Sequence, residues 1–256
     1  MAQSRHAPLA VLPMYDWPEV ADETDRLWNA LRDACRRRRL PAPERLSRGG
    51  DALQSWLNPG LIVGQTCGLP YMRQLRGRVQ MLGSPVYAVH GCAEGDYCSF
   101  VIAAKDGPLG SLEAIAEGHR FAFNGVGSQS GFRAMQQCLR GAGRCDAWLE
   151  AGLETGSHRG SIRAVAEGRA DFAAIDAVSW HLACRHEPAA GAVVRIGATP
   201  ATPGLPMITG LGHDAEILRE AVEEAIAGLG AGTADALRLR GFRRRSDADY
   251  GVYATS

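Results

Sequence analysis

Three small polar residues in a row, Ser128, Gln129 and Ser130, stand between an apolar run and a helical pattern. The run at 121–123 predicts a short strand, and the apolar positions of 131–139 recur at helical spacing. The loop therefore leads from a strand into the start of a helix, where backbone N–H groups and the positive end of the helix dipole favour an anion. An ordinary capping serine in a strand-to-helix turn is the alternative.

Ser157 and His158 stand at the start of a second predicted helix, and Asp176 ends the strand predicted at 170–175. A serine hydroxyl and an imidazole N–H both donate to oxyanions. A histidine in such a site also predicts binding that changes with pH near neutrality. The alternatives are a histidine solvated at the surface and an aspartate that caps the next segment.

Polar side chains also follow the strands predicted in the first quarter of the chain. Tyr15 ends the first apolar strand, and Gln65 and Thr66 follow the buried strand at 61–64. Strands and helices alternate in this region, which predicts a parallel sheet with helices on both faces. Ligands bind at the carboxyl ends of such strands, so we predict these three residues as ligand contacts, although each alone also has a structural reading.

Composition argues against several classes of function. Lysine plus arginine and aspartate plus glutamate number 28 each, so no net charge favours nucleic acid. The arginine clusters at 36–39 and 243–245 are interpreted as solvated faces. Lys105 is the only lysine, which excludes a P-loop, and we expect neither a metal nor a cofactor. No apolar run approaches the roughly 20 residues that span a bilayer.

Seven cysteines cannot all pair with one another. None forms a CxxC motif, and no cysteine and histidine set has zinc spacing. Cys92 and Cys98 flank a short loop, and Cys138 and Cys145 flank a glycine-containing turn. Either pair is a candidate disulfide, and free buried thiols are the alternative.

The alternation of strands and helices stops at 87–105, which reads as two strands joined by a loop. A helix is predicted at 111–117, and the strand at 193–196 is interpreted as returning to the first unit. One unit inserted into another predicts a monomeric, two-lobed clamp with the ligand in a cleft between the lobes. The predicted lobes are 1–97 plus 195–256 for lobe 1, and 98–194 for lobe 2.

Several motifs occur in order along nearly the whole chain. They are NGVGSQSGF at 124–132, GSHRGSIRAV at 156–165, ADFAAID at 170–176, PGLPMI at 203–208 and GFRRRSDADY at 241–250. Together they resemble the phosphate/phosphite/phosphonate substrate-binding proteins of ABC transporters. The first is similar to that family's N-x-x-S-x-S-G-[FY] loop.

The resemblance implies an α/β fold of the type II periplasmic-binding-protein class, with two lobes that each hold a mostly parallel sheet flanked by helices. It implies a small oxyanion ligand, which would be a phosphonate, phosphate or a similar group. It also implies the membrane component of an ABC transporter as the partner.

Site residues carry over from the family position by position. Ser128, Gln129 and Ser130 would hold the phosphonate-like group, with Gln129 in place of a common threonine. His158 would donate to the same oxygens, and Tyr97 would wall the cleft. Asp176 matches an acidic position that pairs with the amine of aminophosphonates. In the first lobe, Gln65 and Thr66 stand where the family has an aromatic residue.

Two other classes of function stay open. An enzyme could use His158 with Ser157, or Cys67 with a distant histidine, although no GxSxG or HExxH motif supports it. A cytosolic or sensory ligand-binding domain of the same fold is the other. The segment at 7–14 contains two prolines and reads as a strand rather than an export signal. We therefore expect a periplasmic protein if a signal was removed from this chain, and a cytoplasmic one otherwise.

Overall fold

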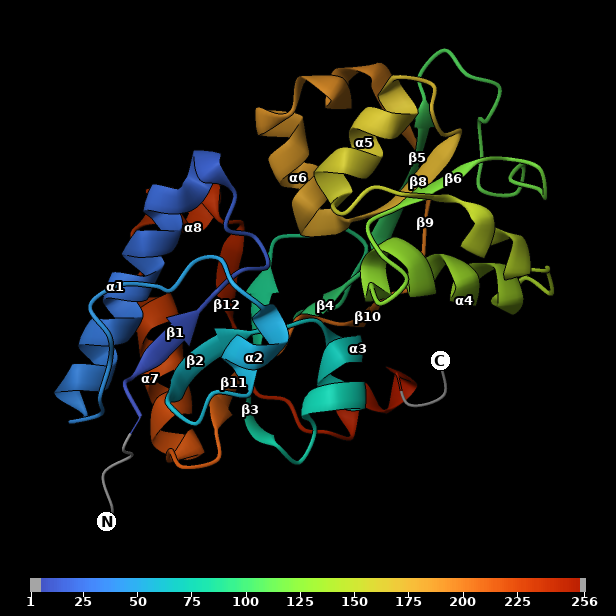
Figure 1. Ribbon diagram of the computed structural model, residues 1–256. Coiled ribbons are helices and arrows are strands. Elements are labelled where there is room, and N and C mark those ends of the chain that lie inside the picture. The colour runs from blue at the N-terminus through green and yellow to red at the C-terminus, as the bar shows by residue number, and fades with distance from the viewer. Residues whose placement is uncertain (1–5, 254–256) are drawn as a thin grey trace. The chain divides into compact units, whose positions relative to one another are not determined.

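The computed structural model describes residues 6–253, which form two compact units. Unit 1 contains the described residues up to Ala88 and from Pro203 onward, and unit 2 is Val89–Thr202 (Figure 1). The chain therefore passes between the units after Ala88 and before Pro203, each about eight residues from the boundaries predicted at 97 and 195. The prediction was wrong there because the strand at 193–196 does not return to unit 1. It pairs within the sheet of unit 2.

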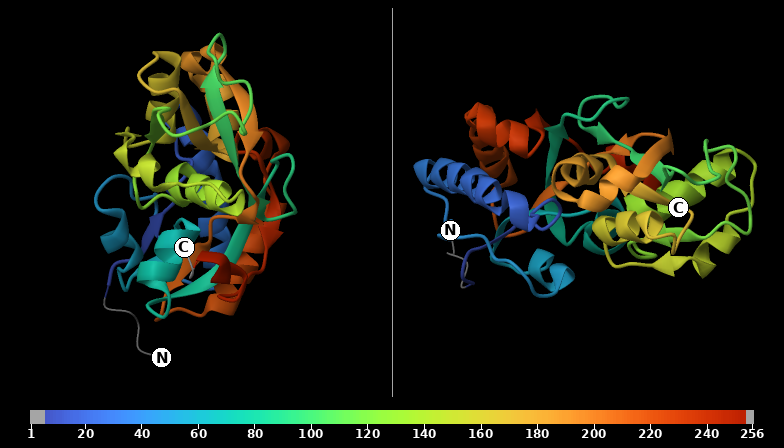
Figure 2. Two further views of the ribbon diagram at one scale, coloured as in Figure 1. Left: turned by 90° about the vertical axis from the view of Figure 1, so that its right-hand side faces the viewer. Right: turned by 90° about the horizontal axis from the view of Figure 1, so that it is seen from above.

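Unit 1 is a five-stranded mixed sheet flanked by helices (Figures 1 and 2). The strand order is β1-β2-β11-β3-β12. β1 and β2 are parallel, whereas β11 is antiparallel to both of its neighbours and β12 is antiparallel to β3. The strands are β1 (Leu9–Val11), β2 (Leu61–Gln65), β3 (Val79–Tyr87), β11 (Met207–Gly210) and β12 (Leu239–Arg243). The helices are α1 (Ala21–Arg37), α2 (Ala52–Trp56), α3 (Gly68–Pro70), α7 (Ala215–Ala227) and α8 (Ala231–Ala236), with short turns η1 (Pro18–Val20), η2 (Tyr71–Leu75) and η6 (Asp249–Tyr253).

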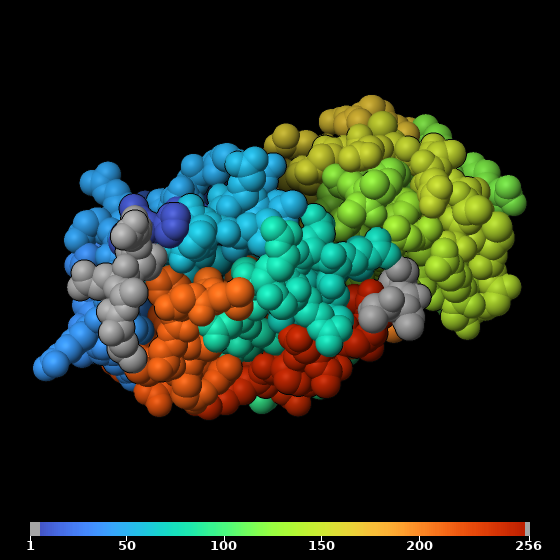
Figure 3. All heavy atoms as spheres, turned by 60° about the horizontal axis from the view of Figure 1, so that its bottom comes forward, coloured from blue at the N-terminus to red at the C-terminus, as the bar shows by residue number. Residues whose placement is uncertain are grey.

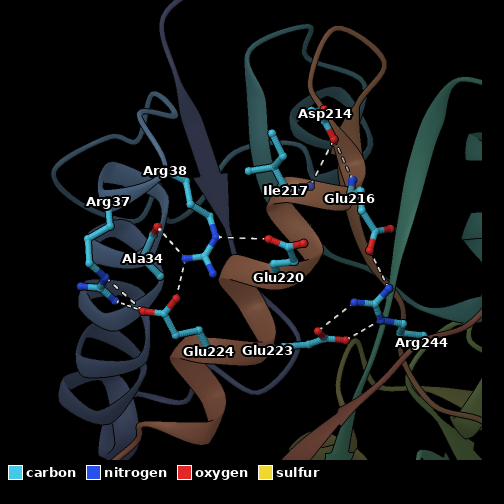
Figure 4. Close-up of polar contacts among 10 residues, drawn as sticks. All are labelled: Ala34, Arg37, Arg38, Asp214, Glu216, Ile217, Glu220, Glu223, Glu224 and Arg244. Atoms are coloured by element: carbon cyan, nitrogen blue, oxygen red, sulfur yellow. Dashed lines mark hydrogen bonds and ion pairs between the residues drawn. The ribbon is translucent and has the colours of Figure 1, made fainter.

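Helices α1 and α7 pack side by side and exchange ion pairs along their exposed edges (Figure 4). Glu224 of α7 accepts from both Arg37 and Arg38 of α1. On the other side of α7, the guanidinium of Arg244 bridges Glu216 and Glu223. Of the arginines predicted as solvated faces, Arg36, Arg37 and Arg244 are exposed and ion-paired, whereas the Arg245 side chain is only 6% exposed. Such exposed pairs contribute little each, at most about 1 kcal/mol.

The C-terminal turn η6 closes unit 1 against η2 (Figure 3). The rings of Tyr71 and Tyr250 meet edge to face with centroids 5.8 Å apart, and the Tyr71 hydroxyl donates to Asp247. Tyr253 is fully buried, and its hydroxyl donates to the Pro203 carbonyl. The motif at 241–250 thus has a structural role that the sequence pattern did not indicate.

Unit 2 is a five-stranded sheet of order β7-β6-β8-β5-β9. β6 is parallel to β7 and β8, and only β5 runs against its neighbours. The strands are β5 (Ser99–Ala104), β6 (Phe121–Phe123), β7 (Leu153–Glu154), β8 (Phe172–Asp176) and β9 (Val193–Ala198), and β4 (Asp96–Tyr97) and β10 (Thr202–Pro203) form a separate two-stranded ladder. The helices are α4 (Ala134–Gly141), α5 (His158–Ala166) and α6 (Ala177–His186), with turns η3 (Gln129–Arg133), η4 (Ala147–Ala151) and η5 (Pro188–Ala192).

An aromatic cluster forms the core of unit 2 behind residues 124–130, which we call the anion loop. The Phe121 ring stacks on Phe172 at 4.9 Å between centroids, and Phe123 meets Phe132 at 4.8 Å. All four rings are at most 2% exposed. Burial of each stabilises the unit by roughly 1.5–3 kcal/mol, so the strand before the loop and the turn after it are held from behind.

The helix predicted at 111–117 is absent from the described structure, which has turns there. Leu112 and Ile115 still pack on the core of unit 2. So short a segment cannot sustain a helix by propensity alone, and its packing selects turns instead. Within the described residues, no helix is long and apolar enough to cross a membrane.

Candidate functional site

The loop after β6 forms the predicted strand-to-helix junction. The helical turn begins at Gln129, two residues before the predicted start, and continues through η3 into α4. Ser128 is the N-cap residue, and its Oγ accepts a hydrogen bond from the Gly131 N–H at 3.0 Å. The first turn of a helix has backbone N–H groups without intrahelical partners, so this junction is suited to an anion.

Ser130 and His158 meet across the two junctions of unit 2. The Ser130 Oγ lies 2.9 Å from the His158 Nε2, although 28 residues separate them in sequence. His158 is the first residue of α5, and Ser157 before it is the N-cap, whose Oγ accepts from the Gly160 N–H at 3.0 Å. The tertiary structure thus brings two of the predicted ligand contacts together at the starts of two helices.

Burial decides the charge of His158. Surrounding protein atoms lower the pKa of its imidazole to about 4, and the Ala174 backbone opposes this only in part. His158 is therefore neutral at physiological pH. This pKa does not support the predicted pH dependence near neutrality, which assumed the pKa of a solvated histidine.

Ser99 holds the loop from behind and was missed by the sequence analysis. Its hydroxyl donates to the Ser130 carbonyl at 2.7 Å, and its own N–H donates to the Thr199 Oγ1 at 3.0 Å. Ser99 lies on β5 and is 1% exposed. No motif marks it, because its contact with the loop exists only once β5 is placed beside β8.

We expect Ser99→Ala to loosen the anion loop, because it leaves the buried Ser130 carbonyl without its hydroxyl donor. The loss should cost about 1–3 kcal/mol and speed amide hydrogen exchange in residues 129–133. Thr209→Val is the matched control, since it removes a similar buried bond in unit 1, from the Thr209 hydroxyl to the Leu61 carbonyl at 3.1 Å. Equal exchange rates in residues 129–133 for the two variants would show that Ser99 does not hold the loop.

The Gln129 side chain is fully buried and turns toward α4. Its Nε2 donates to the Gln137 Oε1 at 3.4 Å. Gln129 was predicted as a ligand contact. In this conformation the amide packs against the helix that follows and the whole residue is buried, so a role of Gln129 in ligand binding stays a prediction.

Asp176 ends β8 and caps α6. Its Oδ1 accepts from the N–H groups of Val178 and Ser179 at 2.8 and 2.9 Å, and the residue is 2% exposed. Asp176 therefore acts as a helix cap, which was the alternative interpretation of this residue. A role in pairing with a ligand amine stays a prediction.

Tyr97 lies on β4, in the segment that links the last strand of the first half of unit 1 to β5. It is 3% exposed. The predicted role of Tyr97 as a wall of the ligand cleft is not tested by its burial within unit 2.

The predicted contacts of unit 1 gather at the end of β2. The Gln65 Nε2 donates to the Tyr87 hydroxyl at 3.0 Å, and the Tyr15 and Tyr87 rings meet edge to face at 5.0 Å. Gln65, Tyr15 and Tyr87 line a cavity of about 30 Å³, which is room for one water molecule. Thr66 is fully buried, and its N–H donates to the Pro206 carbonyl. The sequence analysis missed Tyr87, which supplies an aromatic ring beside Gln65.

The chemistry of the unit 2 site is that of neutral donors at helix starts. Among the described residues, no group of histidine, cysteine, aspartate and glutamate side chains could hold a metal ion. A hydroxyl, an imidazole and the backbone N–H groups of a helix start remain, and these are suited to an oxyanion. The predicted cleft that unites residues of both units stays a prediction.

Comparison with known proteins agrees with this chemistry. Residues 9–250 match the family model described as "ABC transporter, phosphonate, periplasmic substrate-binding protein". No curated protein matches the chain significantly.

Solved structures share the fold at low sequence identity. XAC2383 from Xanthomonas citri, bound to chloride, is 18% identical with a TM-score of 0.70, covering 98% of this chain and 96% of its own. PhnD1 from Prochlorococcus marinus, in complex with methylphosphonate, is 16% identical with a TM-score of 0.70, covering 97% and 96%. A binding protein component of an ABC phosphonate transporter from Pseudomonas aeruginosa is 17% identical with a TM-score of 0.71, covering 96% and 84%. These likenesses place the fold in the type II periplasmic-binding-protein class. With the family match over 9–250, the chain belongs to the phosphonate periplasmic substrate-binding proteins of ABC transporters.

Proposed function

We propose that this protein binds a small tetrahedral oxyanion, a phosphonate or phosphate, at the helix starts of unit 2 and presents it to the membrane component of an ABC transporter. It would act in the periplasm after removal of an export signal. The observation that carries the proposal is the contact between the Ser130 Oγ and the His158 Nε2, at the helix start that Ser128 caps. Family membership supplies the class of ligand.

The charge state of the site supports recognition by hydrogen bonds rather than by ion pairing. His158 is neutral at physiological pH because burial lowers its pKa to about 4. The Ser130 hydroxyl and the backbone N–H groups of η3 would then donate to the oxygens of the anion. Hydrogen bonds to a charged group contribute roughly 1.5–3 kcal/mol each, so a few of them suffice for micromolar binding.

We propose binding without covalent chemistry, although a serine beside a histidine is also the arrangement of a nucleophile and its base. A base with a pKa of about 4 is weak at neutral pH, where a general base works best with a pKa near the operating pH. The Nε2 of His158 therefore serves better as a hydrogen-bonding partner than as a proton acceptor.

The test is calorimetric titration with methylphosphonate, 2-aminoethylphosphonate, phosphate, phosphite, sulfate and a small dicarboxylate. We expect saturable binding of at least one phosphorus oxyanion and weaker binding of the dicarboxylate. Each phosphorus-containing ligand is then recovered and analysed by phosphorus NMR. Preference for the dicarboxylate would overturn the ligand class, and a chemically changed phosphonate would replace the binding proposal with an enzyme.

A further inference from the structure

The loop between Ala88 and β5 brings two of the seven cysteines together. Asp96 donates its N–H to the Ala93 carbonyl at 2.9 Å, which closes a four-residue turn. Gly95 is the third residue of this turn and has φ +78°, a conformation that favours glycine. The turn reverses the chain between Cys92 and Cys98.

The two thiols meet after the reversal. The Cys92 and Cys98 side chains lie within hydrogen-bonding reach of each other. Cys98 is anchored, because its carbonyl accepts from the Ala177 N–H at the start of α6 at 3.0 Å. Cys98 is 5% exposed, whereas Cys92 is only partly buried. One sulfur is therefore fixed by the sheet, and the other is accessible from solvent.

Contact with the Cys92 thiol favours the thiolate of Cys98. The hydrogen bond from Cys92, and to a smaller extent the positive charge of Arg195, lower the pKa of Cys98. The same hydrogen bond and burial raise the pKa of Cys92, with smaller contributions from Asp96 and Asp176. A thiolate is the nucleophile of thiol–disulfide exchange, so the pair already has one sulfur prepared to react and a second beside it.

We propose that Cys92 and Cys98 form an intramolecular disulfide on exposure to a disulfide oxidant, such as oxidised glutathione or a protein thiol oxidase. One cysteine thiolate attacks the oxidant to give a mixed disulfide and releases one thiol. The other cysteine then loses its proton and attacks the mixed disulfide, forming the Cys92–Cys98 bond and releasing the second thiol. Two cysteines are oxidised, and one oxidant disulfide is reduced to two thiols.

The disulfide would fix the backbone of Tyr97, which lies between the turn at 93–96 and the anchored Cys98. It closes a ring of seven residues from Cys92 to Cys98. A disulfide that closes so short a loop stabilises the folded protein less than one that closes a long loop. It still constrains the unfolded chain and so raises the free energy of unfolding. For a protein of this size, we expect the melting temperature of the oxidised form to be about 5 °C higher than that of the reduced form.

The experiment uses the full chain, reduced and then incubated with excess oxidised glutathione. Thiols are counted after denaturation, and peptides are mapped without reduction after cleavage at Glu94, which separates the two cysteines. We expect two of the seven thiols to be lost without any added glutathione mass, and the two flanking peptides to stay joined. Cys184→Ser is the matched control, because it removes an exposed cysteine of unit 2 and should still lose two thiols.

Cys92→Ser should lose both the linked peptides and the rise in melting temperature. The inference is overturned if all seven thiols persist, if Cys92 carries glutathione without closing the ring, or if the mapped bond joins other cysteines. None of these outcomes depends on the ligand, so the disulfide and the proposed function can fail separately.

Discussion

Ser130→Ala is expected to weaken binding of methylphosphonate or phosphate, whichever binds tighter, by tenfold to a hundredfold. The hydroxyl lies 2.9 Å from the His158 Nε2. In the tautomer whose Nε2 carries the proton, the hydroxyl accepts from the imidazole and can turn its own hydrogen toward an anion at the helix start. Losing one charge-assisted hydrogen bond costs about 1.5–3 kcal/mol, which corresponds to this loss of affinity. Calorimetry on purified variants measures it directly.

Stability should change less than affinity in this variant. Gly131 still donates to Ser128, and the aromatic rings behind the loop keep their contacts. Ser246→Ala is the matched control, since it removes an exposed serine hydroxyl of unit 1 that donates to Asp249 at 3.0 Å. If Ser130→Ala binds as tightly as Ser246→Ala, the oxyanion site lies elsewhere in the protein.

The second large effect is on stability in acid. Between pH 7 and pH 4 we expect the free energy of unfolding to fall by about 3 kcal/mol more in the parent protein than in His158→Gln. Burial lowers the pKa of His158 to about 4, whereas an unfolded histidine has a pKa near 6.5. Below pH 6.5 the unfolded chain binds a proton at this histidine, whereas the native protein does not. Protonation stabilises the unfolded state, so the free energy of unfolding decreases as the pH is lowered, until about pH 4.

The glutamine variant has no titrating group at this position, so its stability curve should be flatter by that amount. Chemical denaturation at a series of pH values gives the difference between the two curves. His6→Gln removes an exposed histidine of unit 1 and should follow the parent. Parallel curves for the parent and His158→Gln would show that the imidazole is not withdrawn from water in the native state.

The low pKa of His158 affects stability in acid, but it should not affect binding near neutral pH. Because His158 stays neutral above about pH 5, its titration should not change affinity between pH 6 and pH 8. The resemblance to oxyanion receptors pointed to this histidine correctly as a residue beside Ser130. It could not indicate the charge, because desolvation depends on every element packed around the ring.

Local chemistry was predictable from sequence wherever neighbours along the chain decide it. The strand at 121–123, the capped turn that follows and the start of α5 at His158 all form as the pattern predicts. Each depends on apolar periodicity and a capping hydroxyl, which act within a few residues. The motifs built from these short stretches also sufficed to predict the family that the comparison confirmed.

Contacts between distant segments were decided only by the tertiary structure. The strand at 193–196 has the same composition whichever sheet it joins, and its pairing with β5 follows from packing in unit 2. Tertiary packing also decides three features of the site. Ser99 supports Ser130, the Gln129 side chain turns toward α4, and His158 is uncharged. The sequence by itself determined which residues stand at the helix starts. Which of them meet, and in which charge state, was decided by the burial that only the complete fold provides.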